Sequence, residues 1–198
     1  MAAGRPRAFD KESALEAAML VFWRNGYPGT SLADLTHAMA INKPSLYATF
    51  GNKEQLFMAA LEQYVSQHSF PILENLFALD QPLEQRLYAY FKSISHLYCH
   101  PNLPAGCMLA NSMCEAAGDG VPQSAHTLIS ELNHRAKQRL IDFFTQEKTK
   151  GSLKSQSSPL SLALYLMSIT SGMAVLARNG ATPAELDEMI EHVVTTII

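Results

Sequence analysis

The chain has 198 residues, of which 47% are hydrophobic, and its formal net charge is −3. This size and composition suit one core, or one small module joined to a larger domain. The acidic balance argues against indiscriminate binding of nucleic acid through charge. We find no apolar run near the roughly 18 residues of a membrane helix and no export signal, so the three cysteines are expected to be reduced thiols in a cytoplasmic protein.

The positive charge is placed unevenly. Residues 1–60 contain six Lys or Arg and five Asp or Glu, a net charge of +1, so the remainder carries −4. Arg5, Arg7, Lys43 and Lys53 fall around one short segment and the N-terminal arm before it. We expect modest non-specific affinity for nucleic acid from a single module, which a dimer would increase.

Two helices are predicted at the N-terminal end. Asp10 caps a helix that runs to Arg24, and the turn residues at 25–29 end it. Thr30 or Ser31 can cap a second helix by accepting a hydrogen bond from its free amides. The residues expected to face inward on this second helix are Leu32, Leu35, Ala38 and Met39.

A third short helix follows almost at once. Asn42 can cap it, Pro44 stands where a missing amide hydrogen matters little, and Gly51 ends it. Helical spacing buries Leu46 and Phe50. The same spacing leaves a second group largely toward solvent: Lys43, Ser45, Tyr47, Ala48 and Thr49.

The remaining chain continues to show helical periodicity, with no sustained β alternation, which predicts an all-α protein. Six helices are expected, the first with a bend near Phe70 and Pro71: Lys53 to Leu79, 83–100, 107–117, 122–150, 159–178 and 183–197. The segment 101–106 and the Ser-rich segment 152–158 are predicted loops.

The last two helices are the most apolar of the chain. The helix at 159–178 carries apolar residues around most of its circumference, and the helix at 183–197 carries an apolar stripe. One monomer of this size would struggle to cover both helices. We therefore expect a homodimer that pairs residues 159–197 of two copies in a four-helix interface.

A family resemblance rests on the segment around the third helix. The residues that carry it are Thr30-Ser31-Leu32, Leu35, the run from Ile41 to Tyr47, Phe50, Lys53-Glu54 and Leu56. Together they resemble the DNA-binding domain of the tetracycline-repressor (TetR) family, as does Gly4 to Arg7 of the arm. Gly106 to Leu109 is similar to a Gly-Cys-Leu-Leu motif in part of that family. Thr49 departs from it, because His is usual there and makes a phosphate contact.

The resemblance implies a helix-turn-helix DNA-binding domain over residues 1–52 and a larger helical ligand-binding and dimerisation domain over 53–198. It implies a one-component transcriptional regulator, a repressor, that binds a palindromic operator of double-stranded DNA as a dimer and is released by a small-molecule inducer. The candidate DNA contacts are Arg5, Arg7, Thr30, Ser31, Lys43, Pro44, Ser45, Tyr47, Thr49 and Lys53.

A ligand pocket is expected among the helices between residues 55 and 178. Nine methionines in the chain suit a pocket for a largely apolar effector, although methionine also fills ordinary cores. The candidate lining residues are Phe91, Tyr98, Cys107, Met108, Asn111, Met113 and Met167.

Three alternatives stay open at this point. His96, Cys99 and His100 share one predicted helix face, with Cys107 and Cys114 on the next helix, which suits a metal- or thiol-sensing regulator of the same fold. A helical protein-interaction module without DNA binding would have the same helices. No catalytic motif is present, so we predict no enzyme, no cofactor and no bound metal, and an enzyme using Cys107 with His96 is only formally possible.

Overall fold

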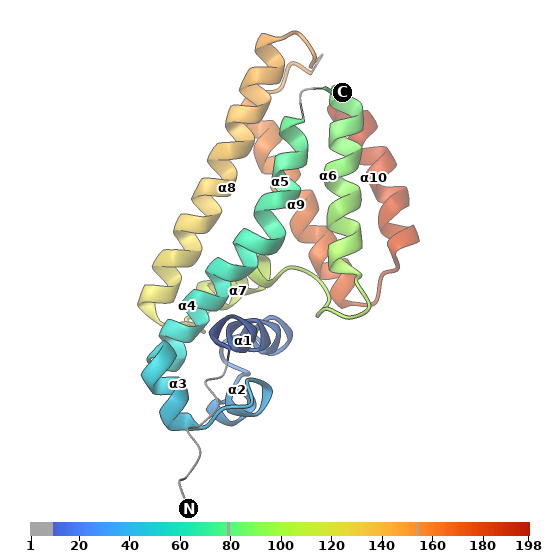
Figure 1. Cartoon of the computed structure of the whole chain (residues 1–198). Coiled ribbons are helices and arrows are strands. Elements are labelled where there is room, and N and C mark those ends of the chain that lie inside the picture. The colour runs from blue at the N-terminus through green and yellow to red at the C-terminus, as the bar shows by residue number, and fades with distance from the viewer. Residues whose placement is uncertain (1–9, 79, 154) are drawn as a thin grey trace, which may run out of the picture.

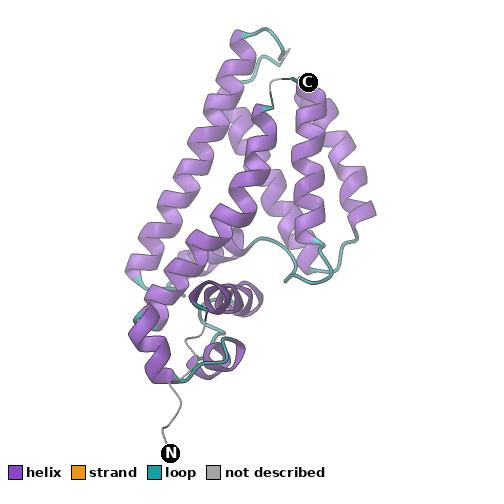
Figure 2. Cartoon of the chain, in the orientation of Figure 1, coloured by secondary structure: helices purple, strands orange, loops and turns teal. Residues whose placement is uncertain are grey.

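The computed structural model describes residues 10–78, 80–153 and 155–198. Within these ranges the chain is helical or in loops and forms no strand, as predicted for an all-α protein (Figure 2). Arg5, Arg7 and the predicted helix end at Leu79 lie outside the described residues.

Three short helices form the N-terminal end, at the bottom of Figure 1: α1 (Lys11–Asn25), α2 (Leu32–Ala38) and α3 (Lys43–Phe50). The Asp10 carboxylate accepts hydrogen bonds from the amides of Glu12 and Ser13, which satisfies free amides at the start of α1. Gly26 ends α1 in the left-handed region, at φ 73°, one residue later than predicted. Ala38 is exposed rather than inward, because α2 ends there and Met39 is buried instead.

The following helix joins the two halves of the molecule and is not regular. It consists of α4 (Lys53–Tyr64), a π-helical turn (Val65–Ser69), α5 (Phe70–Glu74) and a 3-10 turn (Asn75–Phe77). Pro71 has no amide hydrogen, and just before it the Phe70 amide bonds to the Val65 carbonyl, five residues back. The disturbance expected at Pro71 is therefore a change of hydrogen-bond register.

Five further helices complete the larger half: α6 (Leu83–Tyr98), α7 (Met108–Ala117), α8 (Gln123–Thr149), α9 (Pro159–Arg178) and α10 (Pro183–Ile197). α8 packs along α9, and α6 packs along α10, while α7 crosses near the three N-terminal helices (Figure 1). α6 ends two residues before the predicted His100, and Cys107 is the cap of α7 rather than its first residue.

The final helix does not need a partner to cover its apolar stripe. Leu186, Ile190, Val193, Val194 and Ile197 are buried within the monomer, and α10 packs extensively on α6. The expectation that both last helices exceed what one chain can cover is thus wrong for α10. For α9, in contrast, the monomer leaves four large apolar side chains about half exposed: Leu160, Leu164, Val175 and Leu176.

The same helix corrects a second expectation. By length and composition alone α9 could cross a membrane, with a mean hydropathy of 1.8 over its best window. Core helices of soluble proteins meet the same criterion, and α9 packs against both α6 and α8. We therefore interpret α9 as a helix that packs within the larger half of the protein.

A buried ion pair fixes the end of the larger half that lies far from α1. Arg86 of α6 and Glu147 of α8 are almost fully buried, and the Arg86 Nη2 to Glu147 Oε2 distance is 2.7 Å. Arg86 also donates to the Leu76 carbonyl over 2.7 Å. Although burial acts to raise it, the pKa of Glu147 is lowered by its bonds to Arg86 and Lys150. The pair therefore ties three segments together through an ionised carboxylate.

Candidate nucleic-acid interface and ligand cavity

The third helix is held by three local features. The Asn42 side chain accepts a hydrogen bond of 2.9 Å from the Ser45 amide and so caps the helix. The Gly51 amide bonds to the Tyr47 carbonyl, with Gly51 at φ 76°. In the turn before the helix, Ala40 adopts φ 52°, an arrangement more easily taken by glycine. These features define the orientation of α3 relative to α2.

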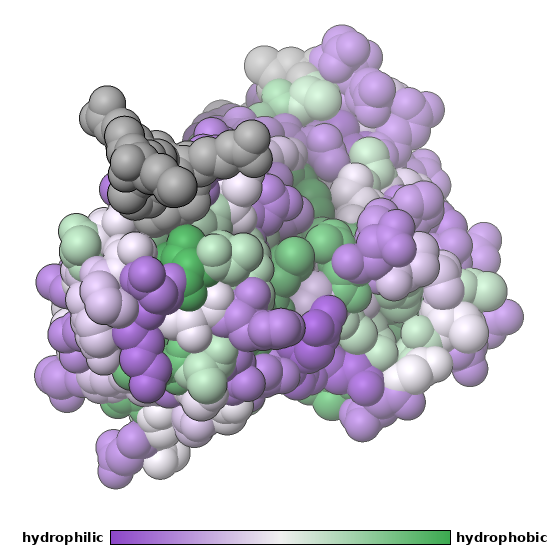
Figure 3. Space-filling view, turned by 60° about the horizontal axis from the view of Figure 1, so that its bottom comes forward, coloured by the Kyte–Doolittle hydropathy of each residue, from purple (hydrophilic) through white to green (hydrophobic). Residues whose placement is uncertain are grey.

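α3 presents one exposed face. Lys43, Pro44 and Tyr47 are exposed, while Ser45 and Thr49 are half-buried. Leu46, on the opposite side, is fully buried. Figure 3 shows the molecule with this end turned forward, and its hydrophilic and apolar side chains are intermixed. The face combines a cation, a phenol and an apolar ring, which are groups that can contact phosphates, base edges and a thymine methyl.

One predicted DNA contact lies buried in the turn before α2. Thr30 is only 2% exposed, and its hydroxyl donates a 2.6 Å hydrogen bond to the Gly26 carbonyl. In this position its hydroxyl closes the turn between α1 and α2 and does not face outward. The sequence could not distinguish Thr30 from Ser31, because both residue types cap helices.

Two other predicted backbone contacts are already engaged within the chain. Ser31 caps α2: its hydroxyl accepts from the Asp34 amide, while the Asp34 carboxylate accepts from the Ser31 amide. The Lys53 ammonium donates to the Tyr27 carbonyl over 2.7 Å and lies 4.1 Å from the centre of the Tyr27 ring. Burial lowers the pKa of Lys53. Ser31 would have to give up its hydroxyl bonds to contact DNA, whereas the Lys53 ammonium has two further N–H donors.

The larger half contains a cavity of about 600 Å³ between α4, α5, α6, α7, α8 and α9. This volume lies within the range of small-molecule sites. Four predicted lining residues do line it: Tyr98, Cys107, Met113 and Met167. The walls are mainly apolar, with contributions from Ile72, Leu73, Ile94, Leu132, Leu140 and Leu164.

Three predicted lining residues do not line the cavity. Phe91 and Met108 are buried in the core, and Asn111 belongs to a different face of α7. On α6, Tyr90, Ile94 and Tyr98 face the cavity, whereas Phe91 does not. Helical spacing did not separate Tyr90 from Phe91, because Phe91 stands seven residues before Tyr98 and so close to it around the helix.

Cys107 lies in the cavity wall with two hydrogen-bond donors on its sulfur. The Tyr64 hydroxyl donates to Cys107 Sγ over 3.3 Å, and the Ala110 amide at the start of α7 donates over 3.4 Å. Tyr98 also lies beside this sulfur, and burial raises its pKa well above the usual range. The sulfur therefore lies where a ligand in the cavity would contact it.

The cysteine and histidine pairs proposed for metal binding do not come together. α6 ends before Cys99, whose thiol donates to the Ala181 carbonyl over 3.4 Å, and His100 Nδ1 accepts from the Asn102 amide. Cys114 is exposed. Among the described residues no group of three metal-ligating side chains occurs. The prediction that these residues share one helix face assumed a helix that continues to His100, whereas α6 ends at Tyr98.

Trp23 of α1 connects the N-terminal helices to the cavity wall, a contact that no local pattern in the sequence indicates. Its indole Nε1 donates to the Gly106 carbonyl over 3.2 Å, directly before Cys107. Its ring packs edge-on against Tyr64 at 4.8 Å and lies 5.5 Å from His68 of the π-helical turn. Tyr64 and Cys107 both line the cavity, so one side chain of α1 contacts two of its walls.

Three further hydrogen bonds hold the end of α1 and the turn that follows it. Arg178 of α9 donates to the Trp23 and Arg24 carbonyls, each over 3.4 Å. Glu115 of α7 accepts a 3.1 Å bond from the Tyr27 amide. Helices α7 and α9, which line the cavity, are thus both bonded to the element on which α2 and α3 rest.

The chain matches two family models. Residues 14–60 match the model described as bacterial regulatory proteins, tetR family, and residues 84–193 match a tetracyclin repressor-like C-terminal domain. The transcriptional repressor ComR of Escherichia coli K12 is 35% identical over 195 residues, covering 98% of this chain and 90% of the relative. The repressor BdcR of the same organism is 30% identical, covering 92% of this chain and 86% of the relative.

A solved structure also resembles the chain closely. It is a cysteine-substituted variant of the TetR family transcriptional regulator CifR, complexed with 26-bp double-strand operator DNA. The two chains share 29% identity with a TM-score of 0.87, covering 98% of this chain and all of CifR.

Proposed function

The chain belongs to the tetR family of bacterial regulatory proteins, and on that premise we propose that it is a transcriptional repressor that a small molecule releases from its operator. The observation that carries the proposal is the exposed face of α3, set by the Asn42 cap and Gly51. Its similarity to ComR and BdcR, both named repressors, and to CifR bound to operator DNA supports the same function. These relatives are regulators and not enzymes, which agrees with the lack of a catalytic motif.

For DNA recognition, we assign α3 to the major groove. Lys43 and Pro44 are exposed at its N-terminus, where a recognition helix contacts bases, and Tyr47 is exposed one turn later. Ser45 and Thr49 border this face. Arg5 and Arg7 remain candidates for the minor groove. Lys53 would contact the phosphate backbone through its remaining N–H donors, and Ser31 would do so only after its hydroxyl leaves Asp34. The buried Thr30 is not among the proposed contacts.

For assembly, we propose a homodimer through residues 159–197. The exposed apolar side chains of α9 support it, since Leu164 and Val175 lie three helical turns apart on one face and Leu160 and Leu176 flank that face. Ser168 and Gly172 stand between them on the same stripe, and a Cβ added at Gly172 would meet open space. These small residues would let a partner helix approach closely. α10 would contribute its polar outer face.

For release, we propose that a ligand in the cavity changes the position of α1 and so the distance between the two α3 helices. Palindromic half-sites require recognition helices about 34–36 Å apart. Trp23, Arg178 and Glu115 provide the contacts by which cavity walls could shift α1, and α4 carries the same shift along its length. A coupling of about 1–3 kcal/mol would weaken operator binding roughly 5- to 150-fold.

The division into domains at residues 52 and 53 stays a proposal. α4 packs on α1 through Phe57, whose ring lies 5.0 Å from that of Phe22, and the other end of α4 lines the cavity through Tyr64. α4 therefore serves both domains. A cytoplasmic location likewise follows from the proposed operator binding and remains part of the proposal.

A thiol-responsive variant of this function has one specific observation in its favour. Cys107 accepts two hydrogen bonds at the cavity wall, whereas Cys99 is bonded to a carbonyl and Cys114 lies outside the cavity. If a thiol is the sensor, we therefore assign it to Cys107. Alkylation of the protein should then abolish operator binding in the parent and leave Cys107→Ser bound.

The experiment that tests the main proposal is a selection of genomic fragments bound by the full chain, followed by affinity measurements on the selected site. Tyr47→Ala and Lys43→Ala should each weaken binding by about 1–3 kcal/mol without changing the melting temperature. Lys137→Ala removes the same charge from α8 and should bind as the parent does. Affinity should fall steeply with salt. Unchanged binding by both α3 variants would instead support a protein-interaction module.

A further inference from the structure

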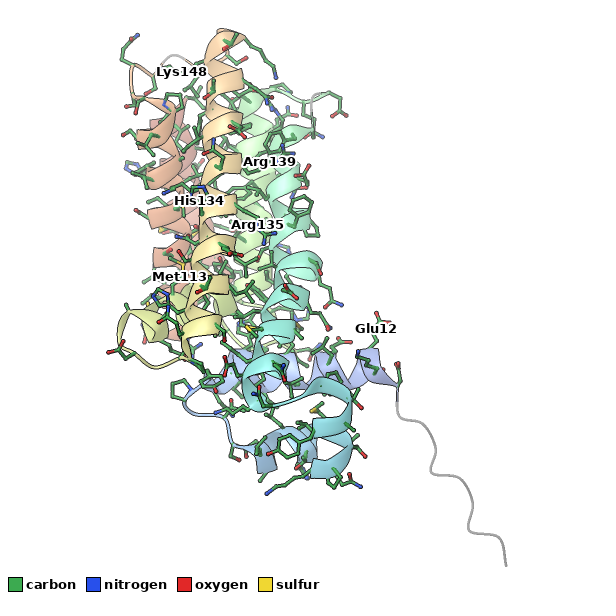
Figure 4. The ribbon with its side chains drawn as sticks, turned by 90° about the vertical axis from the view of Figure 1, so that its left-hand side faces the viewer. Glu12, Met113, His134, Arg135, Arg139 and Lys148 are labelled. Carbon is green, nitrogen blue, oxygen red and sulfur yellow. The ribbon has the colours of Figure 1, made fainter. Side chains whose placement is uncertain are left out.

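The charges that line the cavity are of one sign. Arg135 and Arg139 of α8 line it, and among the described residues no Asp or Glu does. They stand four residues apart and therefore on one face of the helix. Figure 4 shows both on the side of α8 toward α5, with Met113 lower in the view. A cavity with apolar walls and a positive edge favours a negatively charged ligand.

The two arginines differ in what they have available. Arg139 is occupied, because its Nη2 lies 2.9 Å and 3.2 Å from the two carboxylate oxygens of Glu74. Its guanidinium also lies 3.7 Å from the centre of the Phe77 ring. Arg135 is exposed at the cavity, and within the described ranges it makes no hydrogen bond or ion pair. Its five N–H donors are thus free for a bidentate carboxylate.

An unused donor also lies on the opposite wall. Tyr90 of α6 lines the cavity and is only 7% exposed, and no hydrogen bond to its hydroxyl occurs among the described residues. Buried hydroxyls in folded proteins nearly always have a partner. The neighbouring Tyr64 hydroxyl, by contrast, is bonded to Cys107. The Tyr90 hydroxyl is therefore open to the cavity and available to an oxygen of a bound ligand.

We propose that the effector is an apolar monocarboxylate whose carboxylate binds Arg135 and whose other end carries a hydroxyl or carbonyl oxygen that binds Tyr90. The apolar body fills the cavity between the two ends, along Leu132, Ile94 and Met167. The ionised end belongs at Arg135, since a carboxylate buried among phenols without a cation would be strongly disfavoured. This assignment deepens the proposed function and depends on it for its regulatory meaning.

The test is calorimetric titration of the full chain with decanoate, 10-hydroxydecanoate and 1-decanol, with chain lengths of 8 to 14 carbons as a series. Decanoate should bind at least about tenfold tighter than 1-decanol, and the hydroxy acid roughly threefold tighter again. Arg135→Gln should remove the first preference and Tyr90→Phe the second. Lys137→Gln, on the same helix but outside the cavity, should change neither.

Several outcomes would overturn the assignment. These are equal binding of acid and alcohol by the parent, an acid preference that survives Arg135→Gln, or no binding of any acid in the series. Operator binding by the same preparations separates the two proposals. A protein that binds its operator but is released by neutral molecules alone would retain the proposed function and refute the carboxylate. A protein that prefers the acid but binds no operator would retain the carboxylate site and refute the proposed function.

Discussion

The ion pair between Arg86 and Glu147 gives the sharpest stability prediction. Substituting Glu147→Gln keeps the shape of the side chain but leaves the Arg86 guanidinium, only 5% exposed, without its counter-charge. Because both groups are buried, solvent screening gives little relief. Removing one partner of such a pair costs about 3–5 kcal/mol, which is a large part of the stability of a typical domain.

Urea denaturation at pH 7 would measure this loss in the free energy of unfolding. The double variant Arg86→Met with Glu147→Leu removes both charges and should recover most of it, since apolar replacement of a buried pair is often neutral or stabilising. A loss below about 1 kcal/mol in Glu147→Gln, or no recovery in the double variant, would refute the reasoning that the pair is buried and mutually dependent.

The same pair makes a pH prediction. The folded pKa of Glu147 lies below its unfolded value, so its contribution to stability is present above about pH 4.5 and is lost as pH falls through the folded pKa. The parent should lose more stability on acidification than Glu147→Gln does. Parallel acid denaturation curves for the two proteins would contradict this.

Three other outcomes are expected. Ala40→Gly should raise the free energy of unfolding by about 1 kcal/mol, because Ala40 holds a positive φ. It should leave operator affinity unchanged. Urea denaturation and a gel-shift assay measure the two quantities, and a less stable variant would contradict the prediction. Trp23→Phe removes the hydrogen bond to Gly106 and should lower the free energy of unfolding by about 1–3 kcal/mol. It should also reduce the factor by which a cavity ligand weakens operator binding. An unchanged factor would show that Trp23 does not couple the cavity to α1. Leu176→Asp places a charge on the exposed face of α9 and should yield monomers in light scattering, whereas an intact dimer would move the interface elsewhere.

Local signals in the sequence predicted the helical elements well. Caps and stops such as Asn42 and Gly51 act within one turn, so their effect can be deduced from neighbouring residues. The all-α fold class and the family resemblance are confirmed. The choice between Thr30 and Ser31 as cap could not be made, because it depends on which hydroxyl meets the Gly26 carbonyl.

Contacts between distant residues were not predictable in this way. Arg86 and Glu147 are 61 residues apart, and Trp23 meets Gly106 across 83 residues. Whether Phe91 or Tyr90 faces the cavity depends on the rotation of α6 about its axis relative to its neighbours. The sequence of α6 alone does not specify that rotation. The apolar stripe of α10 was likewise assigned to a partner, because nothing in its own sequence identifies α6 as its cover.

Interference footprinting of the full chain on its selected genomic site tests the central claim most directly. We expect two equivalent major-groove contacts related by a dyad, centred one helical turn of about 10–10.5 bp or a multiple of it apart, and both absent with Tyr47→Ala. A single unsymmetrical contact, or a footprint that Tyr47→Ala leaves intact, would contradict recognition by paired α3 helices.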